Sequence, residues 1–200
     1  MSSTSWYDVT DGGLETLQRS LITLEADTKK QRSYSPEIIP GLLQTRHYAR
    51  AILAKCAAVL ELTDDSEATA RLERQAVLDL PGHDFHMLIG ESALRTTVGS
   101  SEVMAAQIRQ LADVLTAREH VRIGIIPLSA EFVAPAINFV LHDTSHVDSE
   151  GITGPIENTE SVEIELVERT FDLLATTAVY GDDARVLLDH ALAAHVGPGI

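Results

Sequence analysis

The chain has 200 residues, 44% of them hydrophobic, which suffices for one domain with a sizeable core, and no apolar run is long enough to span a bilayer. Its 15 basic and 30 acidic residues give a formal net charge of −15 without any long basic run, so direct binding to a nucleic-acid backbone is not expected. Its single cysteine, Cys56, cannot form an internal disulfide, and the first residues do not resemble a secretory signal, so we expect a cytoplasmic protein.

The first predicted element is a helix over residues 13–30, where leucines recur every three or four positions. It is followed by the segment SYSPEIIPGLLQTRHYARA, residues 33–51. Pro36 and Pro40 bias the residues before them toward extended backbone. Gly41 then permits a tight turn, and Thr45 is predicted to cap the next helix.

That second helix is predicted over residues 45–61. Its apolar residues recur at three- and four-residue steps and predict one buried stripe: Ala49, Ile52, Leu53, Cys56, Val59 and Leu60. Cys56 is therefore expected to be buried as a small hydrophobic side chain.

The remaining elements alternate between helices and short strands. Helices are predicted over residues 65–80, from Ser100 or Ser101 to about 115, from 162 to 174, and from about 182 to 192, the last capped by Asp182 or Asp183. Strands are predicted at 85–89, 121–126 and 137–142, with a weaker one at 146–152. The sequence thus predicts a single α+β domain over residues 1–200, with a core at about 6–195 and a frayed tail at 196–200. About six helices should pack around a three- to four-stranded sheet.

Several motifs resemble one known family in their order along the chain. They are PGLLQT and YARA in the segment above, RLERQAVL at 71–78, GESALRTTVGSSEVMAAQIRQL at 90–111, VRIGIIPLSA at 121–130 and VDSEGITG at 147–154. This pattern is similar to the C-terminal domain of unknown function, of the DUF5753 type, in actinobacterial helix-turn-helix regulators of the XRE family. The resemblance covers about residues 6–195, and we expect the chain to lack the N-terminal DNA-binding domain that such regulators carry.

The resemblance implies a sensory or interaction domain that binds a small molecule or a small companion protein, or that forms a homodimer. It also implies a recurring polar set made of Glu91, Arg95 and Glu150. Arg71 and Arg74 match family positions too, and they either form ion pairs or line a cleft with Gln44, Thr45 and Tyr48. The expected ligand-binding residues are therefore Gln44, Tyr48, Arg74, Glu91 and Arg95.

Neither a metal site nor a cofactor is expected. His83 and His86, and His142 and His146, are spaced as pairs, but zinc needs three or four converging ligands, and a turn is expected at 143–145. The chain also lacks a phosphate-binding glycine motif and a nucleophile elbow. No nucleotide cofactor is therefore predicted.

An enzyme remains the alternative to a binding domain. Carboxylates at the ends of buried strands can serve as acids or bases, and Glu91 and Glu150 both occupy such positions. In that alternative the chain is a cyclase or isomerase of specialised metabolism. Glu91 or Glu150 would move a proton with His86 or His142, and Arg95 would stabilise an anion.

Overall fold

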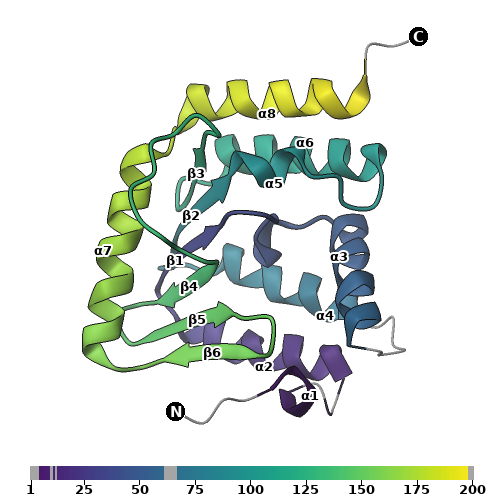
Figure 1. Ribbon diagram of the computed structural model, residues 1–200. Helices are drawn as coiled ribbons and strands as arrows, with labels where there is room; N and C mark the ends of the chain where they lie inside the picture. The colour runs from purple at the N-terminus through teal and green to yellow at the C-terminus, as the bar shows by residue number, and fades with distance from the viewer. Residues whose placement is uncertain (1–4, 10, 12, 61–66, 198–200) are drawn as a thin grey trace.

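A six-stranded mixed sheet in the order β3-β2-β1-β4-β5-β6 runs through the protein (Figure 1). The computed structural model describes residues 5–9, 11, 13–60 and 67–197. Three strands are parallel: β1 (Lys30–Ser35), β2 (Asp84–Gly90) and β3 (Val121–Ile126). The other three form an antiparallel meander that joins β1 through β4: β4 (Phe139–His142), β5 (His146–Glu150) and β6 (Pro155–Asn158).

Helix α7 (Ser161–Thr177) crosses one side of the sheet and contacts β1, β3, β4 and β5 (Figure 1). The other side carries α2 (Gly13–Asp27), α4 (Glu67–Arg74), α6 (Ser101–Ala117) and α8 (Gly181–Val196). The described residues also form α1 (Trp6–Val9), α3 (Arg46–Val59), α5 (Glu91–Arg95) and two 3-10 turns, η1 (Gly41–Leu43) and η2 (Gln75–Asp79). None of the helices described is long and apolar enough to cross a membrane.

Alternation along the strands divides the core between the two faces of the sheet. In β2, Phe85, Met87 and Ile89 point into the larger core with α6 and α8, because successive side chains of a strand point to opposite faces. Leu88 points the other way, into a smaller core under α7 that contains Phe139 and Phe171. The predicted α+β class and single domain are confirmed.

Two predicted helix caps are confirmed. The Thr45 hydroxyl accepts from Tyr48 N at the start of α3, and the Ser100 hydroxyl accepts from Val103 N at the start of α6. The last helix begins one residue before the predicted caps, since Tyr180 is its N-cap and Asp182 and Asp183 lie in its first turn.

The predicted apolar stripe of α3 is partly wrong. Its buried residues are Tyr48, Ala49, Leu53 and Ala57, whereas Cys56 is exposed and Val59 is 79% exposed. The helix packs against α4 and α6 and leaves its remaining side in solvent. Periodicity alone predicted a wider contact than this packing provides.

The strand count was predicted too low because two strands lack an apolar pattern. The sequence of β1, KQRSYS, is polar on both faces, and residue 30 was placed in a helix that in fact ends at Asp27. The edge strand β6 begins at Pro155, a residue that weakens a strand signal and is tolerated at edges.

The helix count was also low, at about six against eight α-helices in the described residues. The short α1 and α5 escape a periodicity analysis, which needs several turns. The predicted third helix, 65–80, is α4 followed by η2, and it lies partly outside the described residues.

Candidate functional site

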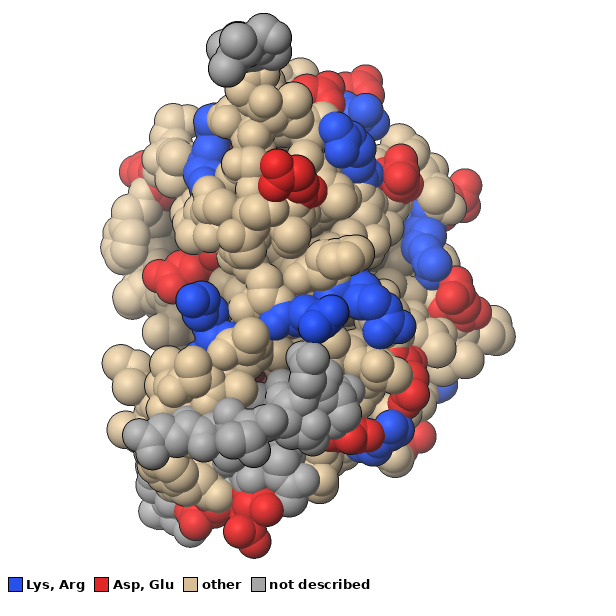
Figure 2. Space-filling model, turned by 90° about the vertical axis from the view of Figure 1, so that its right-hand side faces the viewer, with Lys and Arg blue, Asp and Glu red and all other residues tan. Residues whose placement is uncertain are grey.

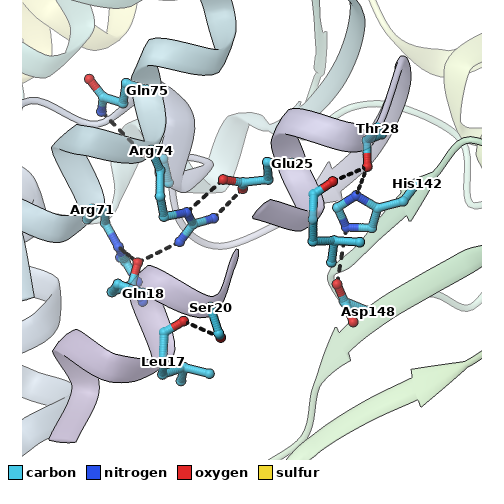
Figure 3. Close-up of polar contacts among 12 residues, drawn as sticks. Leu17, Gln18, Ser20, Glu25, Thr28, Arg71, Arg74, Gln75, His142 and Asp148 are labelled. Carbon is cyan, nitrogen blue, oxygen red and sulfur yellow. Dashed lines mark hydrogen bonds and ion pairs between the residues drawn. The ribbon is translucent and has the colours of Figure 1, made fainter. Parts of the chain in front are cut away.

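Helix α4 meets α2 through charged hydrogen bonds (Figure 3). Arg74 Nε and Nη2 donate to the two carboxylate oxygens of Glu25 at 2.9 and 2.5 Å. Gln18 Oε1 accepts from Arg71 Nε at 3.0 Å and from Arg74 Nη1 at 2.5 Å. Gln18 and Glu25 are each 3% exposed, and their spacing of seven residues places them on one face of α2. The buried face of α2 is thus polar at its centre.

Gln44 and Tyr48 close the turn that precedes α3. Gln44 Oε1 accepts from Arg71 Nη1 at 3.1 Å, and its amide nitrogen donates to Ile39 O at 2.7 Å. The Tyr48 hydroxyl accepts from Ile39 N at 3.1 Å. Burial, followed by the neighbouring charge of Arg74, lowers the pKa of the Arg71 guanidinium to about 10. The structure therefore brings together three of the expected ligand-binding residues, Gln44, Tyr48 and Arg74. Their polar groups already form hydrogen bonds with other groups of the protein.

A second buried network joins the end of α2 to the β4–β5 hairpin (Figure 3). Thr28 Oγ1 lies 3.0 Å from His142 Nδ1, and His142 Nε2 lies 3.1 Å from Asp148 Oδ2. His146 Nε2 reaches the other oxygen of Asp148 at 2.7 Å. The predicted turn at 143–145 is confirmed, and it places His142 directly opposite His146 in the hairpin.

This network resembles a Thr–His–Asp relay, but its position argues for a structural role. Thr28 and His142 are 4% and 3% exposed, so a substrate cannot reach the hydroxyl in the folded chain. Burial alone would raise the pKa of Asp148, but the hydrogen bond from His142 and the charge of His146 lower it below its ordinary value. In the described part of the chain, no group of three or more His, Cys, Asp or Glu side chains has an arrangement that could hold a metal ion.

Glu91 and Arg95 form a pair at the carboxyl end of β2. Glu91 Oε1 accepts from Arg95 Nη2 at 2.7 Å, and its other oxygen accepts from Leu128 N at 3.0 Å. Burial opposes ionisation of Glu91, but these hydrogen bonds hold its pKa below the ordinary value. Glu150 lies on β5, which β1 and β4 separate from β2, and it accepts from Asn138 Nδ2 at 3.4 Å. The structure therefore joins Glu91 to Arg95 and leaves Glu150 apart.

The remaining candidate, His86, lines a cavity of about 340 Å³ between the sheet and α7. Its floor is made by His86 and by two buried residues, Arg32 from β1 and Phe171 from α7. Its rim is made by exposed or partly exposed residues: Lys30, Arg122, Asp172, Ala175, Thr176 and Tyr180. Glu91, Glu150 and His142 do not line it.

The basic residues of this pocket form a row across three neighbouring strands. Arg32 on β1 pairs in register with His86 on β2, and His86 pairs with Arg122 on β3. Lys30 lies two residues before Arg32 and therefore on the same face. The pocket consequently collects three cations although the chain as a whole is acidic.

These charges and the burial of the ring keep His86 neutral. Burial, followed by the charge of Arg122, lowers the pKa of His86 to about 4, although the charge of Asp84 opposes the shift. Its Nε2 lies 3.0 Å from the Tyr180 hydroxyl, which in turn donates to Ala175 O at 3.3 Å. Arg122 lies over the Tyr180 ring, 4.1 Å from its centroid, and burial raises the pKa of Tyr180. Aromatic rings and guanidinium groups thus form adjoining walls of the pocket.

Arg32 has an unmet hydrogen-bonding capacity. Its Nη2 donates to Glu168 Oε1 at 2.5 Å and to Asp143 O at 3.3 Å. Its Nε is buried and has no hydrogen-bond partner among the described residues. A buried donor without an acceptor is costly, so an acceptor that reached this guanidinium would be favoured.

Sequence analysis found His86 but missed the rest of this pocket. Lys30 and Arg32 were hidden because β1 was not predicted as a strand. A usable signal was present in VRIGII, where Arg122 interrupts an otherwise apolar strand. A charged residue in such a strand indicates that this position faces solvent or a polar cavity.

Comparison with known proteins gives one family. A family model described as a domain of unknown function (DUF5753) matches residues 18–190. The chain therefore belongs to the DUF5753 family. Searches of curated proteins and of solved structures gave no match.

Proposed function

We propose that this DUF5753 domain is a sensory domain that binds a small molecule in the pocket between the sheet and α7. Its volume, about 340 Å³, lies at the lower end of the range for small-molecule sites. The observation that carries the proposal is the convergence of Lys30, Arg32 and Arg122 on one cavity in a chain of net charge −15. The resemblance to XRE-type regulators supports a sensing role, and the lone cysteine supports a cytoplasmic location.

We further propose that the domain does not bind DNA itself. Basic side chains do gather in a band across the face that carries α3, where Arg46, Arg50 and Lys55 are exposed (Figure 2). Acidic side chains lie on both sides of that band, and the overall charge repels a phosphate backbone (Figure 2). Titration of a labelled duplex at low salt tests this, and tight salt-sensitive binding would contradict it.

The binding proposal is tested by filling the pocket. Ala175→Trp places a large ring at the pocket wall, and Glu165→Trp places the same ring at an exposed position of the same helix that does not line the pocket. A fragment library is screened against the unsubstituted protein by thermal shift and by amide NMR spectra. Fragments whose NMR shifts map to the pocket should lose binding in Ala175→Trp and keep it in Glu165→Trp. Equal binding to both variants would refute the site.

A second role, binding a companion protein or a second copy of the chain, is favoured by the outer side of α7. Val162, Leu166 and Leu173 are 69%, 58% and 48% exposed, and their spacing places them on one side of the helix. Light scattering of the purified protein tests self-association. If it reports dimers, Leu166→Glu should shift them to monomers, whereas a dimer that persists in this variant would exclude this surface.

A further inference from the structure

We propose that the ligand of the α7 pocket is a small anion, a carboxylate or a phosphate, attached to a flat aromatic group. This inference rests on the proposed function, because it assigns a chemical class to the molecule that the same pocket binds. It follows from three properties of the pocket: the row of cations, their incomplete neutralisation and the aromatic walls.

The sheet itself positions the cations. Arg32, His86 and Arg122 occupy matched positions on adjacent strands, which lie about 4.8 Å apart in a sheet. The backbones of Arg32 and Arg122 are therefore about 10 Å apart, a span that long side chains can close from both ends around one oxygen-bearing group. Lys30, two residues along β1 on the same face, adds a third charge at the rim.

The protein neutralises these charges only in part. Glu168 pairs with Arg32 at 2.5 Å, and Asp172 lies at the rim. Lys30 and Arg122 form no ion pair with any carboxylate of the described residues, and Arg32 Nε lacks an acceptor. Among the lining residues, cations thus exceed carboxylates by three to one, and two further carboxylates lie nearby, Glu168 on Arg32 and Asp84 close enough to raise the pKa of His86. A cationic ligand would be repelled here, and an anionic oxygen would be a stronger acceptor for the Arg32 donor than a neutral one.

The walls favour a flat group beside the anion. The rings of His86 and Phe171 meet edge to face with centroids 4.9 Å apart, and Tyr180 stands 5.7 Å from His86. Arg122 already covers one face of the Tyr180 ring and lines the pocket, so its planar guanidinium offers a surface on which an aromatic ligand ring can stack. An aromatic ligand ring can therefore contact apolar and cation–π surfaces while its anionic group faces Arg32 and Lys30.

His86 provides a readout that reports the charge of the ligand. Burial and the three nearby cations hold its pKa at about 4, and the charge of Asp84 opposes them in part. A bound anion opposes those cations and so favours the protonated ring. The pKa of His86, followed by NMR of its ring protons, should therefore rise when an anion binds, whereas a neutral ligand should not raise it.

The test uses four probes and measures affinity by calorimetry. Benzoate and phenyl phosphate carry both proposed features, benzyl alcohol lacks the charge, and inorganic phosphate lacks the ring. The two aromatic anions should bind at least tenfold more tightly than benzyl alcohol and inorganic phosphate. The ratio of the dissociation constants of benzoate and phenyl phosphate shows whether the pocket prefers a carboxylate or a phosphate.

Two matched variants test whether the aromatic anions bind in the pocket. Arg122→Gln removes a pocket cation at an exposed position and should weaken aromatic anions about tenfold, as expected for a charged hydrogen bond. Arg169→Gln removes the same charge from an exposed position of α7 outside the pocket and should change affinity less than twofold.

Every other result of these experiments contradicts one part of the proposal. If benzyl alcohol matches benzoate and Ala175→Trp abolishes both, the pocket binds small molecules but the anionic class is wrong. If inorganic phosphate matches phenyl phosphate, the aromatic group is wrong. If neither aromatic anion binds, or binding persists in Ala175→Trp, this class is wrong for the pocket. The fragment screen then decides separately whether the pocket is a ligand site.

Discussion

Tyr180 lies so close to Gly124 that a Cβ atom on the glycine would come within 2.7 Å of the ring carbon Cε1. Gly124 is in the middle of β3, and Tyr180 lies in the connection between α7 and α8. The absence of a side chain at Gly124 allows this connection to rest directly on the sheet. The ring is thereby held where it contacts His86 and Arg122 and forms one wall of the pocket.

Replacing Gly124 with alanine should displace Tyr180. We expect a loss of about 1–3 kcal/mol in the free energy of unfolding, typical of an overpacked interior, together with weaker ligand binding in the pocket. Urea denaturation measures the first effect and near-ultraviolet circular dichroism detects the moved tyrosine. Gly41→Ala is the control, because a Cβ there meets no atom closer than 3.9 Å. Equal stability of both variants would show that the contact is not restrictive.

The Glu25–Arg74 pair should contribute strongly to stability. Their side chains are 3% and 11% exposed, and Glu25→Gln leaves a largely buried guanidinium without its carboxylate. We expect a loss of about 3 kcal/mol in the free energy of unfolding, measured by urea denaturation. Glu73→Gln breaks the exposed pair with Arg19 and should have little effect, because water and salt screen it. Similar losses from both changes would argue against a structural role for the buried network.

His86 should make the protein less stable in mild acid. Its pKa is about 4 in the folded protein, below the ordinary value of 6.5, so between these values the unfolded chain binds a proton that the folded protein does not. The free energy of unfolding should therefore decrease as the pH falls from about 6.5 to 4.

His86→Gln should remove that part of the pH dependence, about 1 kcal/mol once solvent screening of a partly exposed ring is allowed for. Denaturation curves at pH 7 and pH 5 provide the comparison. His47→Gln, at an exposed position of α3, is the control and should retain the slope of the unsubstituted protein. A slope that survives in His86→Gln would assign the effect to another group.

Asp148 should act in the same direction as His86 but at lower pH. Its folded pKa lies below the ordinary 3.8, so its stabilising contribution is complete above about that pH and is lost as the pH falls through the folded pKa. Asp148→Asn should lower stability at pH 7 by about 1–3 kcal/mol, because two histidines lose a charged acceptor, and should flatten the loss below pH 4. Asp189→Asn, at a side chain that is 57% exposed, should change neither.

The contrast between β1 and β2 explains which strands the sequence could predict. In β2 the residues Phe85, Met87 and Ile89 meet an apolar core, so the pattern of apolar residues records the strand. In β1 the buried residues are the polar Gln31, Arg32 and Ser33, and Lys30 and Arg32 line the pocket. A central strand whose buried positions are polar has no signal in hydrophobic periodicity.

The polar contacts also fall into those that the sequence predicts and those that it does not. Thr45 and Ser100 cap their helices through neighbours three residues away, and short-range rules predicted both. Gln18 and Glu25 occupy a leucine-rich helix, and their burial depends on Arg71 and Arg74 about fifty residues later. Nothing within α2 indicates that its polar residues face inward.

The amino-acid sequence by itself determined the α+β class, the capped helices, the apolar strands and the family, because these depend on neighbouring residues or on motifs in order. Only the tertiary structure determined the pocket. Its residues come from β1, β2, β3, α7 and the α7–α8 connection, and strand register and helix docking bring these segments together. The physical reason is that a row across a sheet is made of single residues from separate strands, and no local pattern along the chain specifies which of them become neighbours.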